Sequence, residues 1–259
     1  MLRNLTFRSV LLVVLAGLMG AFAPLVPSSA QSGKPLVAVL GSVDISQEDV
    51  KTFLDNTGKF LAVDMINIGR DTPPLRRLVK YDAVLVWSDN SLGNPGLLGD
   101  ILADYIDQGG GVVVAPFGFD AKNGPVEKRA IEGRFLTDNY YVIPAESGFT
   151  YGQRRTLGQV LEKDHPIMKG IKTVDGGSRS YYAPTARVTE GSTVVARWDN
   201  GDVLLAVKTI QKGEKTLRRA DVNLYPASDR LVSYFWDTSS DAGDLFANAL
   251  LWVAKKTGN

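Results

Sequence analysis

The chain has 259 residues, with 29 lysines and arginines against 28 aspartates and glutamates, one histidine and no cysteine. The absence of cysteine excludes thiol catalysis, disulfide bonds and the usual zinc sites, which need several nitrogen and sulfur ligands. The near-neutral charge argues against a nucleic-acid or membrane-surface role, because both favour a positive field.

The first thirty residues have the pattern of a secretory signal. Arg3 and Arg8 precede an apolar run over residues 10–22, and small residues follow up to Ala30. The alternative is a retained membrane anchor, but Gly17, Gly20 and Pro24 interrupt the uncharged segment over residues 9–26, which only just reaches the ~18 residues that a span needs. We therefore expect residues 1–30 to be a cleaved signal peptide. The protein is then periplasmic or extracellular, with no stable membrane span.

The rest of the chain, residues 31–259, is long enough for one domain with its own hydrophobic core. No repeat and no low-complexity linker divides it. Because it has no cysteine, its stability has to come from packing.

Apolar strands alternate with helical patterns in the first half of this domain. Strands that are apolar on both faces are typical of a parallel sheet covered by helices, so we expect an α/β domain with a doubly wound, mainly parallel sheet. The glycines at 109–111 end a helix and open no helix, so they are a helix stop and not a phosphate-binding loop. The predicted strands are residues 35–40, 62–68, 81–87 and 112–116, and the predicted helices are residues 47–56, 73–80 and 95–108.

The pattern changes after residue 119. Residues 120–158 form a long excursion rich in Gly, Pro, Asn and aromatic residues, with one strand-like piece at residues 140–144. Three alternating segments follow, and we expect them to form an antiparallel extension at the edge of the sheet. Residues 241–256 are amphipathic and predict a closing helix. The three alternating segments are residues 192–198, 203–209 and 217–224.

Three phrases carry a resemblance to a known family. They are GGGVVVAPFG after the long helix, DHPIMKGI at residues 164–171 and DLFANALLWVA at residues 244–254. Together with the order of elements, they resemble the class I glutamine amidotransferase-like superfamily, and they look most like its trehalose-utilisation-like branch. The resemblance implies a flavodoxin-like sheet with helices on both faces. It also implies a catalytic cysteine on a tight turn after a strand, where this chain has Phe117, so amidotransferase activity is not expected.

Another mechanism would have to use His165, since a Ser-His-Asp relay needs a histidine base and the chain has no other. Ser88, with Asp89 beside it, would be the nucleophile, yet no G-x-S-x-G motif surrounds it. His165 is followed by Pro166, which is typical of a turn in which the imidazole caps the backbone or packs. We expect this structural role, and a general base is the alternative.

One segment has the composition of a calcium site, but a turn explains it as well. Asp199, Asn200 and Asp202 could supply oxygen ligands to calcium, but this composition between two alternating runs is typical of a hairpin turn. We expect a turn, and neither a metal nor a cofactor.

A ligand site is predicted from the sheet topology. In open α/β sheets, ligands bind outside the carboxyl ends of the strands, where the strand order reverses. The loops there supply a polar, mildly acidic rim next to aromatic rings, including Phe119, which suits hydroxyl-rich ligands such as sugars. Arg134 and Arg179 either close this rim or pair with acids. The candidate ligand-binding residues are Ser42, Asp44, Trp87, Ser88, Asp89, Asn90, Phe117 and Asp120.

Three functions remain open. The leading one is an exported, non-catalytic domain that binds a ligand, with carbohydrate as a candidate, or a protein partner in an envelope or extracellular assembly. The second is a carbohydrate-active hydrolase that uses Asp44, Asp89 and Asp120, two of which would have to stand ~5 to 9.5 Å apart. The third is a structural module whose exposed aromatic residues dock another protein.

Overall fold

The computed structural model describes residues 33–121 and 129–255, so the predicted signal peptide lies outside the described residues. The strands are β1 (Leu36–Gly41), β2 (Ala62–Asn67), β3 (Ala83–Val86), β4 (Gly111–Val114), β5 (Leu157–Val160), β6 (Ser192–Trp198), β7 (Val203–Lys212) and β8 (Lys215–Val222). The helices are α1 (Asp44–Asn56), α2 (Leu75–Leu78), α3 (Pro95–Asp107), α4 (Gly133–Thr137) and α5 (Ala242–Val253), with a 3-10 helix at Pro166–Met168. No helix of this part of the chain is both long and apolar enough to span a membrane.

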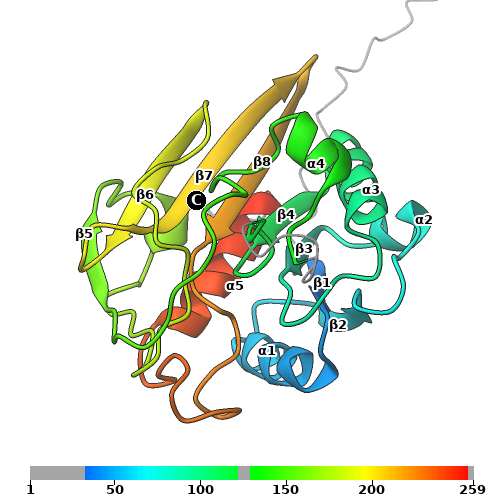
Figure 1. Ribbon diagram of the computed structural model, residues 1–259. Helices are drawn as coiled ribbons and strands as arrows, with labels where there is room; N and C mark the ends of the chain where they lie inside the picture. Colours follow the sequence, from blue (N-terminus) through cyan, green and yellow to red (C-terminus); the bar gives the residue numbers. More distant parts are fainter. Residues whose placement is uncertain (1–32, 122–128, 256–259) are drawn as a thin grey trace, which may run out of the picture. The chain divides into compact units, whose positions relative to one another are not determined.

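The described strands form an eight-stranded sheet in the order β2-β1-β3-β4-β8-β7-β6-β5 (Figure 1). From β2 to β8 in this order, neighbouring strands are parallel. From β8 to β5 they are antiparallel. The prediction of a mainly parallel, doubly wound sheet with an antiparallel extension is therefore confirmed.

Helices cover both faces of the sheet. Apolar side chains of α1 and α5, such as Phe53 and Phe246, share one buried core. Those of α2, α3 and α4, such as Leu102 and Phe135, share a second core on the other face. β3 and β4 between the two cores are buried along their whole length, as the continuous apolar runs predicted.

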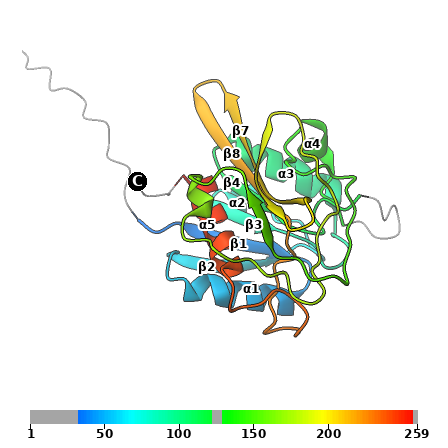
Figure 2. The same ribbon diagram turned by 90° about the vertical axis from the view of Figure 1, so that its left-hand side faces the viewer.

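Two turn predictions are also confirmed. α3 ends at the glycines, and Gly109 has a φ of +105°, which favours a residue without a side chain. Asn200 and Gly201 lie in the turn between β6 and β7, where Gly201 has a φ of +89°. Figures 1 and 2 show the hairpin of β7 and β8 extending past its neighbours, and the side chains at its tip are exposed.

β8 pairs antiparallel with β7, as predicted, but it lies inside the sheet because it also pairs parallel with β4, with Ala220 opposite Val113. The sheet edges are β2 and β5. Apolar alternation could not reveal this, because both strand directions bury alternate side chains.

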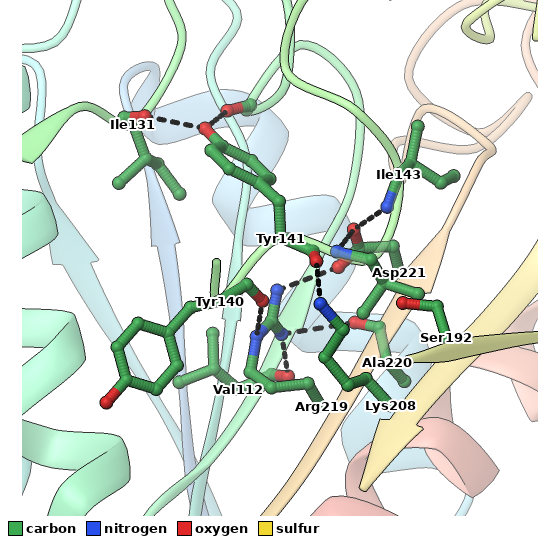
Figure 3. Close-up of polar contacts among 12 residues, drawn as sticks. Val112, Ile131, Tyr140, Tyr141, Ile143, Ser192, Lys208, Arg219, Ala220 and Asp221 are labelled. Carbon is green, nitrogen blue, oxygen red and sulfur yellow. Dashed lines mark hydrogen bonds and ion pairs between the residues drawn. The ribbon is translucent and has the colours of Figure 1, made fainter. Parts of the chain in front are cut away.

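The strand-like piece at residues 140–144 is not a strand. The N–H groups of Val142 and Ile143 donate to the carboxylate of Asp221, at 3.0 and 2.8 Å, and to no neighbouring strand (Figure 3). The apolar side chains of this piece pack into the second core. Burial therefore explains why residues 140–144 are apolar. The side chain of Asp221 accepts the hydrogen bonds that a neighbouring strand would otherwise accept.

Candidate functional site

The loops that follow β1 and β3 meet where the strand order reverses, and Ser42 ties them together. Its hydroxyl accepts hydrogen bonds from the N–H groups of Asp89 and Asn90, at 2.9 and 2.8 Å. It also lies 3.3 Å from the Asn90 carbonyl, to which it donates. Asp44, in the first turn of α1, accepts from the side-chain amide of Asn67 at 2.6 Å. Ser42, Asp89 and Asn90 therefore meet at this edge, whereas the hydrogen bond of Asp44 goes to Asn67 at the end of β2.

Ser88 and His165 are not arranged as a nucleophile and base. Ser88 is fully buried, and its hydroxyl donates to the Arg129 carbonyl at 2.9 Å. The Nδ1 atom of His165 accepts from the Ile167 N–H at 3.2 Å, and its ring lies 5.0 Å from that of Trp252. Burial, and then the nearby charge of Arg218, lowers the pKa of His165. The predicted capping role of His165 is confirmed.

Asp89 is the most unusual polar residue at this edge. Both of its carboxylate oxygens are shielded from solvent. Burial raises its pKa, while Ser46, Tyr225 and Trp87 lie close enough to lower it. The Asp89 carboxylate is therefore buried beside the Trp87 indole and the hydroxyls of Ser46 and Tyr225, which offset part of the cost of burying its charge.

Phe117 fills the turn after β4, where the resemblance implies a cysteine. Its side chain is only 6% exposed. Its ring centroid lies 4.6 Å from that of Phe149 and 5.7 Å from that of Tyr225. The guanidinium of Arg129 lies over the same ring, 4.8 Å from its centroid. With Trp87 also fully buried, the crevice at this turn is filled by packed rings.

The aromatic packing continues outward to the surface. Tyr151 is 56% exposed and stacks on Tyr181, with 5.0 Å between the centroids and 11° between the planes. The guanidinium of Arg179 lies 4.9 Å from the Tyr234 ring centroid, so it packs on an aromatic ring. We call this group of residues the aromatic cluster. It comprises Phe117, Phe149, Tyr151, Tyr181, Tyr225, Tyr234 and Phe235.

Other predicted residues lie apart from this cluster. Phe119 is buried in the second core, on the opposite face of the sheet. Asp120 is 1% exposed and forms an isolated β-bridge with Glu146, so its role in binding stays a prediction. Arg134 pairs with Asp104 at 2.5 Å, which is the acid pairing that the sequence left open.

Several residues of the site were missed by the sequence reasoning. Ser46 lies on α1, Arg129 lies within the long excursion, and Tyr225 follows β8. A signal was present in the loop segments that contain Tyr181 and Tyr234, since each holds consecutive aromatic residues. Such runs in loops are a reason to expect a surface aromatic cluster.

A buried hydrogen-bond network holds the turn that carries Phe117 (Figure 3). The hydroxyl of Tyr141 lies 2.7 Å from the carbonyl oxygens of both Gly118 and Ile131, and its single hydrogen is shared between these two acceptors. Lys208 donates to the Tyr141 carbonyl at 3.0 Å, and burial lowers the pKa of this lysine to about 8. The turn that carries Phe117 is thereby joined to the sheet through Tyr141.

The centre of this network is an ion pair within β8. Arg219 and Asp221 are fully buried and lie 2.8 Å apart. Arg219 also donates to the carbonyls of Tyr140 and Val112. Because Asp221 accepts from the segment after α4, the pair fixes that segment to the sheet.

Comparison with solved structures shows the fold. No protein-family model and no curated protein matches the chain. Among solved structures, a ThuA-like protein from Bacteroides uniformis aligns over 88% of this chain and 95% of its own, at 16% identity and a TM-score of 0.53. The fold is that of ThuA-like proteins.

Two further structures extend the likeness. A glutamine amidotransferase from Thermotoga maritima aligns over 86% of this chain and 99% of its own, at 8% identity and a TM-score of 0.50. The IFT52 N-terminal domain aligns over 86% of this chain and 98% of its own, at 10% identity and a TM-score of 0.55. This chain thus has an amidotransferase-like fold without a cysteine.

Proposed function

We propose that this protein is an exported, non-catalytic domain that binds a hydroxyl-rich ligand, with carbohydrate as the leading class. The ligand surface is the aromatic cluster together with the loop that carries Asp89. The observation that carries the proposal is Phe117. A packed ring replaces the nucleophile that the fold would use, while exposed rings remain around it.

The surrounding chemistry supports a neutral, polar ligand. Exposed and half-buried tyrosines offer ring faces on which a sugar can stack, and their hydroxyls can hydrogen-bond. Arg179, already packed on Tyr234, adds a donor at the rim. A protein partner in an envelope or extracellular assembly is the second candidate, since Tyr151 also exposes a large aromatic surface.

The test is binding of the purified protein to an array of neutral and acidic oligosaccharides. We expect selective binding that Tyr151→Ala weakens at least 10-fold. Leu161→Ala, another exposed apolar residue outside the aromatic cluster, is the matched control. Binding that is absent, or equal in wild type and Tyr151→Ala, would contradict the carbohydrate proposal and favour a protein partner.

A glycoside hydrolase is the alternative function, and the raised pKa of Asp89 favours it. The raised pKa of Asp89 suits a general acid, because enzymes often keep such a carboxyl protonated by burying it. Hydrolysis of glycoside substrates by the purified protein, lost in Asp89→Asn, would replace the non-catalytic proposal with this one. We expect no hydrolysis.

Export is supported by the sequence of residues 1–30. The test is the mass of the protein recovered from a secreting bacterial host. We expect a chain that begins close to Gln31. Recovery of the whole chain in the cytoplasm would refute export.

A further inference from the structure

We infer that the protein forms a dimer in which the β2 strands of two copies pair antiparallel about a twofold axis. β2 lies at one edge of the sheet, so no described strand bonds to the backbone on its outer side. Unpaired edges attract other strands, and proteins usually protect them by keeping the edge strand short, charged or irregular. This surface is separate from the aromatic cluster, and the dimer does not depend on the proposed function.

The two edges of the sheet are protected to different degrees. β5 has four residues, and its pairing with β6 is irregular between Leu157 and Val160. β2 has six residues that pair with β1 in one continuous register. It contains no proline or lysine and a single charged residue, Asp64. β2 is therefore the edge that remains suited to further pairing.

Exposed apolar side chains lie along β2. Leu61, directly before the strand, is 72% exposed, and Met65 within it is 37% exposed. Each is two residues away from Val63, so the alternation of side chains places Leu61 and Met65 on the same face of the sheet. Covering them removes apolar surface from water, which favours association.

The sequence of β2 makes the strand complementary to itself in one register. When the twofold axis passes through Val63, Leu61 lies opposite the partner subunit's Met65, and Asp64 lies opposite the partner subunit's Ala62. An axis through Asp64 would instead place two carboxylates opposite each other, which is destabilising. An axis through Ala62 would place Met65 opposite Lys59, which lies outside the strand. The pairing around Val63 therefore matches apolar residues and keeps the like charges apart.

This arrangement closes with two copies. Because a twofold interface uses the same surface on both subunits, no second β2 edge is left free. The edges of the joined sheet are then the two β5 strands, which are short and irregular. A dimer is therefore expected, and not a filament.

The first experiment measures the mass of the purified protein by sedimentation equilibrium over a dilution series. We expect a dimer that dissociates on dilution. Leu61→Lys places a charge opposite the partner's Met65 and should weaken self-association at least 10-fold. Leu161→Lys, which changes an exposed leucine beside β5, is the matched control and should associate as wild type does. Circular dichroism of each variant checks that it is folded.

The second experiment tests the register with introduced cysteines, because the chain has none of its own. An oxidised mixture of Leu61→Cys and Met65→Cys proteins should form a mixed disulfide dimer, since opposite residues of antiparallel strands lie about 4.5–5.5 Å apart. Leu61→Cys alone should not cross-link, because its two copies would lie four residues, about 14 Å, apart along the strands.

A wild type that stays monomeric up to its solubility limit would overturn the inference and leave the edge to a strand of another protein. A dimer that Leu61→Lys does not weaken would place the interface elsewhere, so it would overturn the inference too. Cross-linking of Leu61→Cys with itself, or none in the mixture, would refute the pairing around Val63.

Discussion

The hydroxyl of Ser46 lies 3.2 Å from the hydroxyl of Tyr225, although 179 residues separate them in the chain. A second contact reinforces the same junction. Asp49 accepts hydrogen bonds from the N–H and the hydroxyl of Ser228, at 2.6 and 3.0 Å. α1 and the chain after β8 are thus fixed to each other beside Asp89. The candidate site therefore forms only when the first and last parts of the described sheet are in place.

We predict that Asp89→Asn stabilises the protein at pH 7. Burial raises the pKa of Asp89 in the folded state. Stability therefore falls as the pH rises from the unfolded pKa of about 3.9 through the raised folded pKa. An asparagine has no such charge, so we expect a higher Tm at pH 7, by roughly 2–4 °C for each kcal/mol gained. Thermal unfolding measured from pH 3 to pH 8 checks this.

The matched control for Asp89 is Asp71→Asn, at an exposed position. It should leave the Tm unchanged at pH 7. A lower Tm for Asp89→Asn than for Asp71→Asn would mean that the Asp89 carboxylate stabilises the fold.

Arg219→Met should be among the most destabilising substitutions in the chain. It leaves Asp221 buried with its charge unpaired, and breaking such a pair costs about 3–5 kcal/mol. The double variant Arg219→Met with Asp221→Asn should recover part of this loss, because an asparagine oxygen can still accept from the segment after α4. Urea unfolding of wild type, the two single variants and the double variant gives the coupling free energy between Arg219 and Asp221. Additive effects would mean that the two side chains act independently.

Lys208 should make stability depend on alkaline pH. Burial, and then the charge of Arg219, lowers its folded pKa from 10.5 to about 8. Between these values the unfolded chain holds more protons, so stability rises with pH by up to about 1.4 kcal/mol per pH unit. Lys208→Met should lack this rise. If the unfolding free energies of wild type and Lys208→Met change equally with pH between pH 8 and pH 10.5, the prediction is wrong. Tyrosines titrate in both proteins, so their contribution cancels in the comparison.

His165→Asn should leave ligand binding intact. An asparagine oxygen can still accept from the Ile167 N–H, so the loss at pH 8 should not exceed about 1 kcal/mol, the scale of one hydrogen bond. The folded pKa of His165 is lowered, so wild type loses stability as the pH falls below the unfolded value of about 6.5. The variant should lose less between pH 7 and pH 5. Abolished binding with an unchanged Tm would restore a functional role for His165.

The sequence was sufficient to predict the parallel half of the sheet, because its strands are apolar on both faces and glycines mark the helix end. Residues 140–144 show the limit of such patterns. Their apolar side chains predicted burial, but their backbone hydrogen bonds go to Asp221, about 80 residues further along the chain. No local periodicity encodes a partner at that distance.

The site was predictable only in part. Asp89 and Phe117 follow strands whose carboxyl ends the topology brings together, so the sequence pointed to them. Tyr181 and Tyr225 come from loops whose paths depend on tertiary packing, so nothing local placed them beside Phe117. The same holds for Phe119, which is two residues from Phe117 and yet packs on the other face of the sheet.

The pairing of β4 with β8 sets the order in which the molecule can fold. Arg219 of β8 bonds to Val112 of β4 across 107 residues of chain. During synthesis, β4 therefore has no β8 to pair with until almost the whole domain has left the ribosome. Long-range pairing of this kind is slow to form, because the loop must be closed before the contacts that stabilise it exist. A chain that completes its central sheet last remains loosely structured until its C-terminal strands have been made.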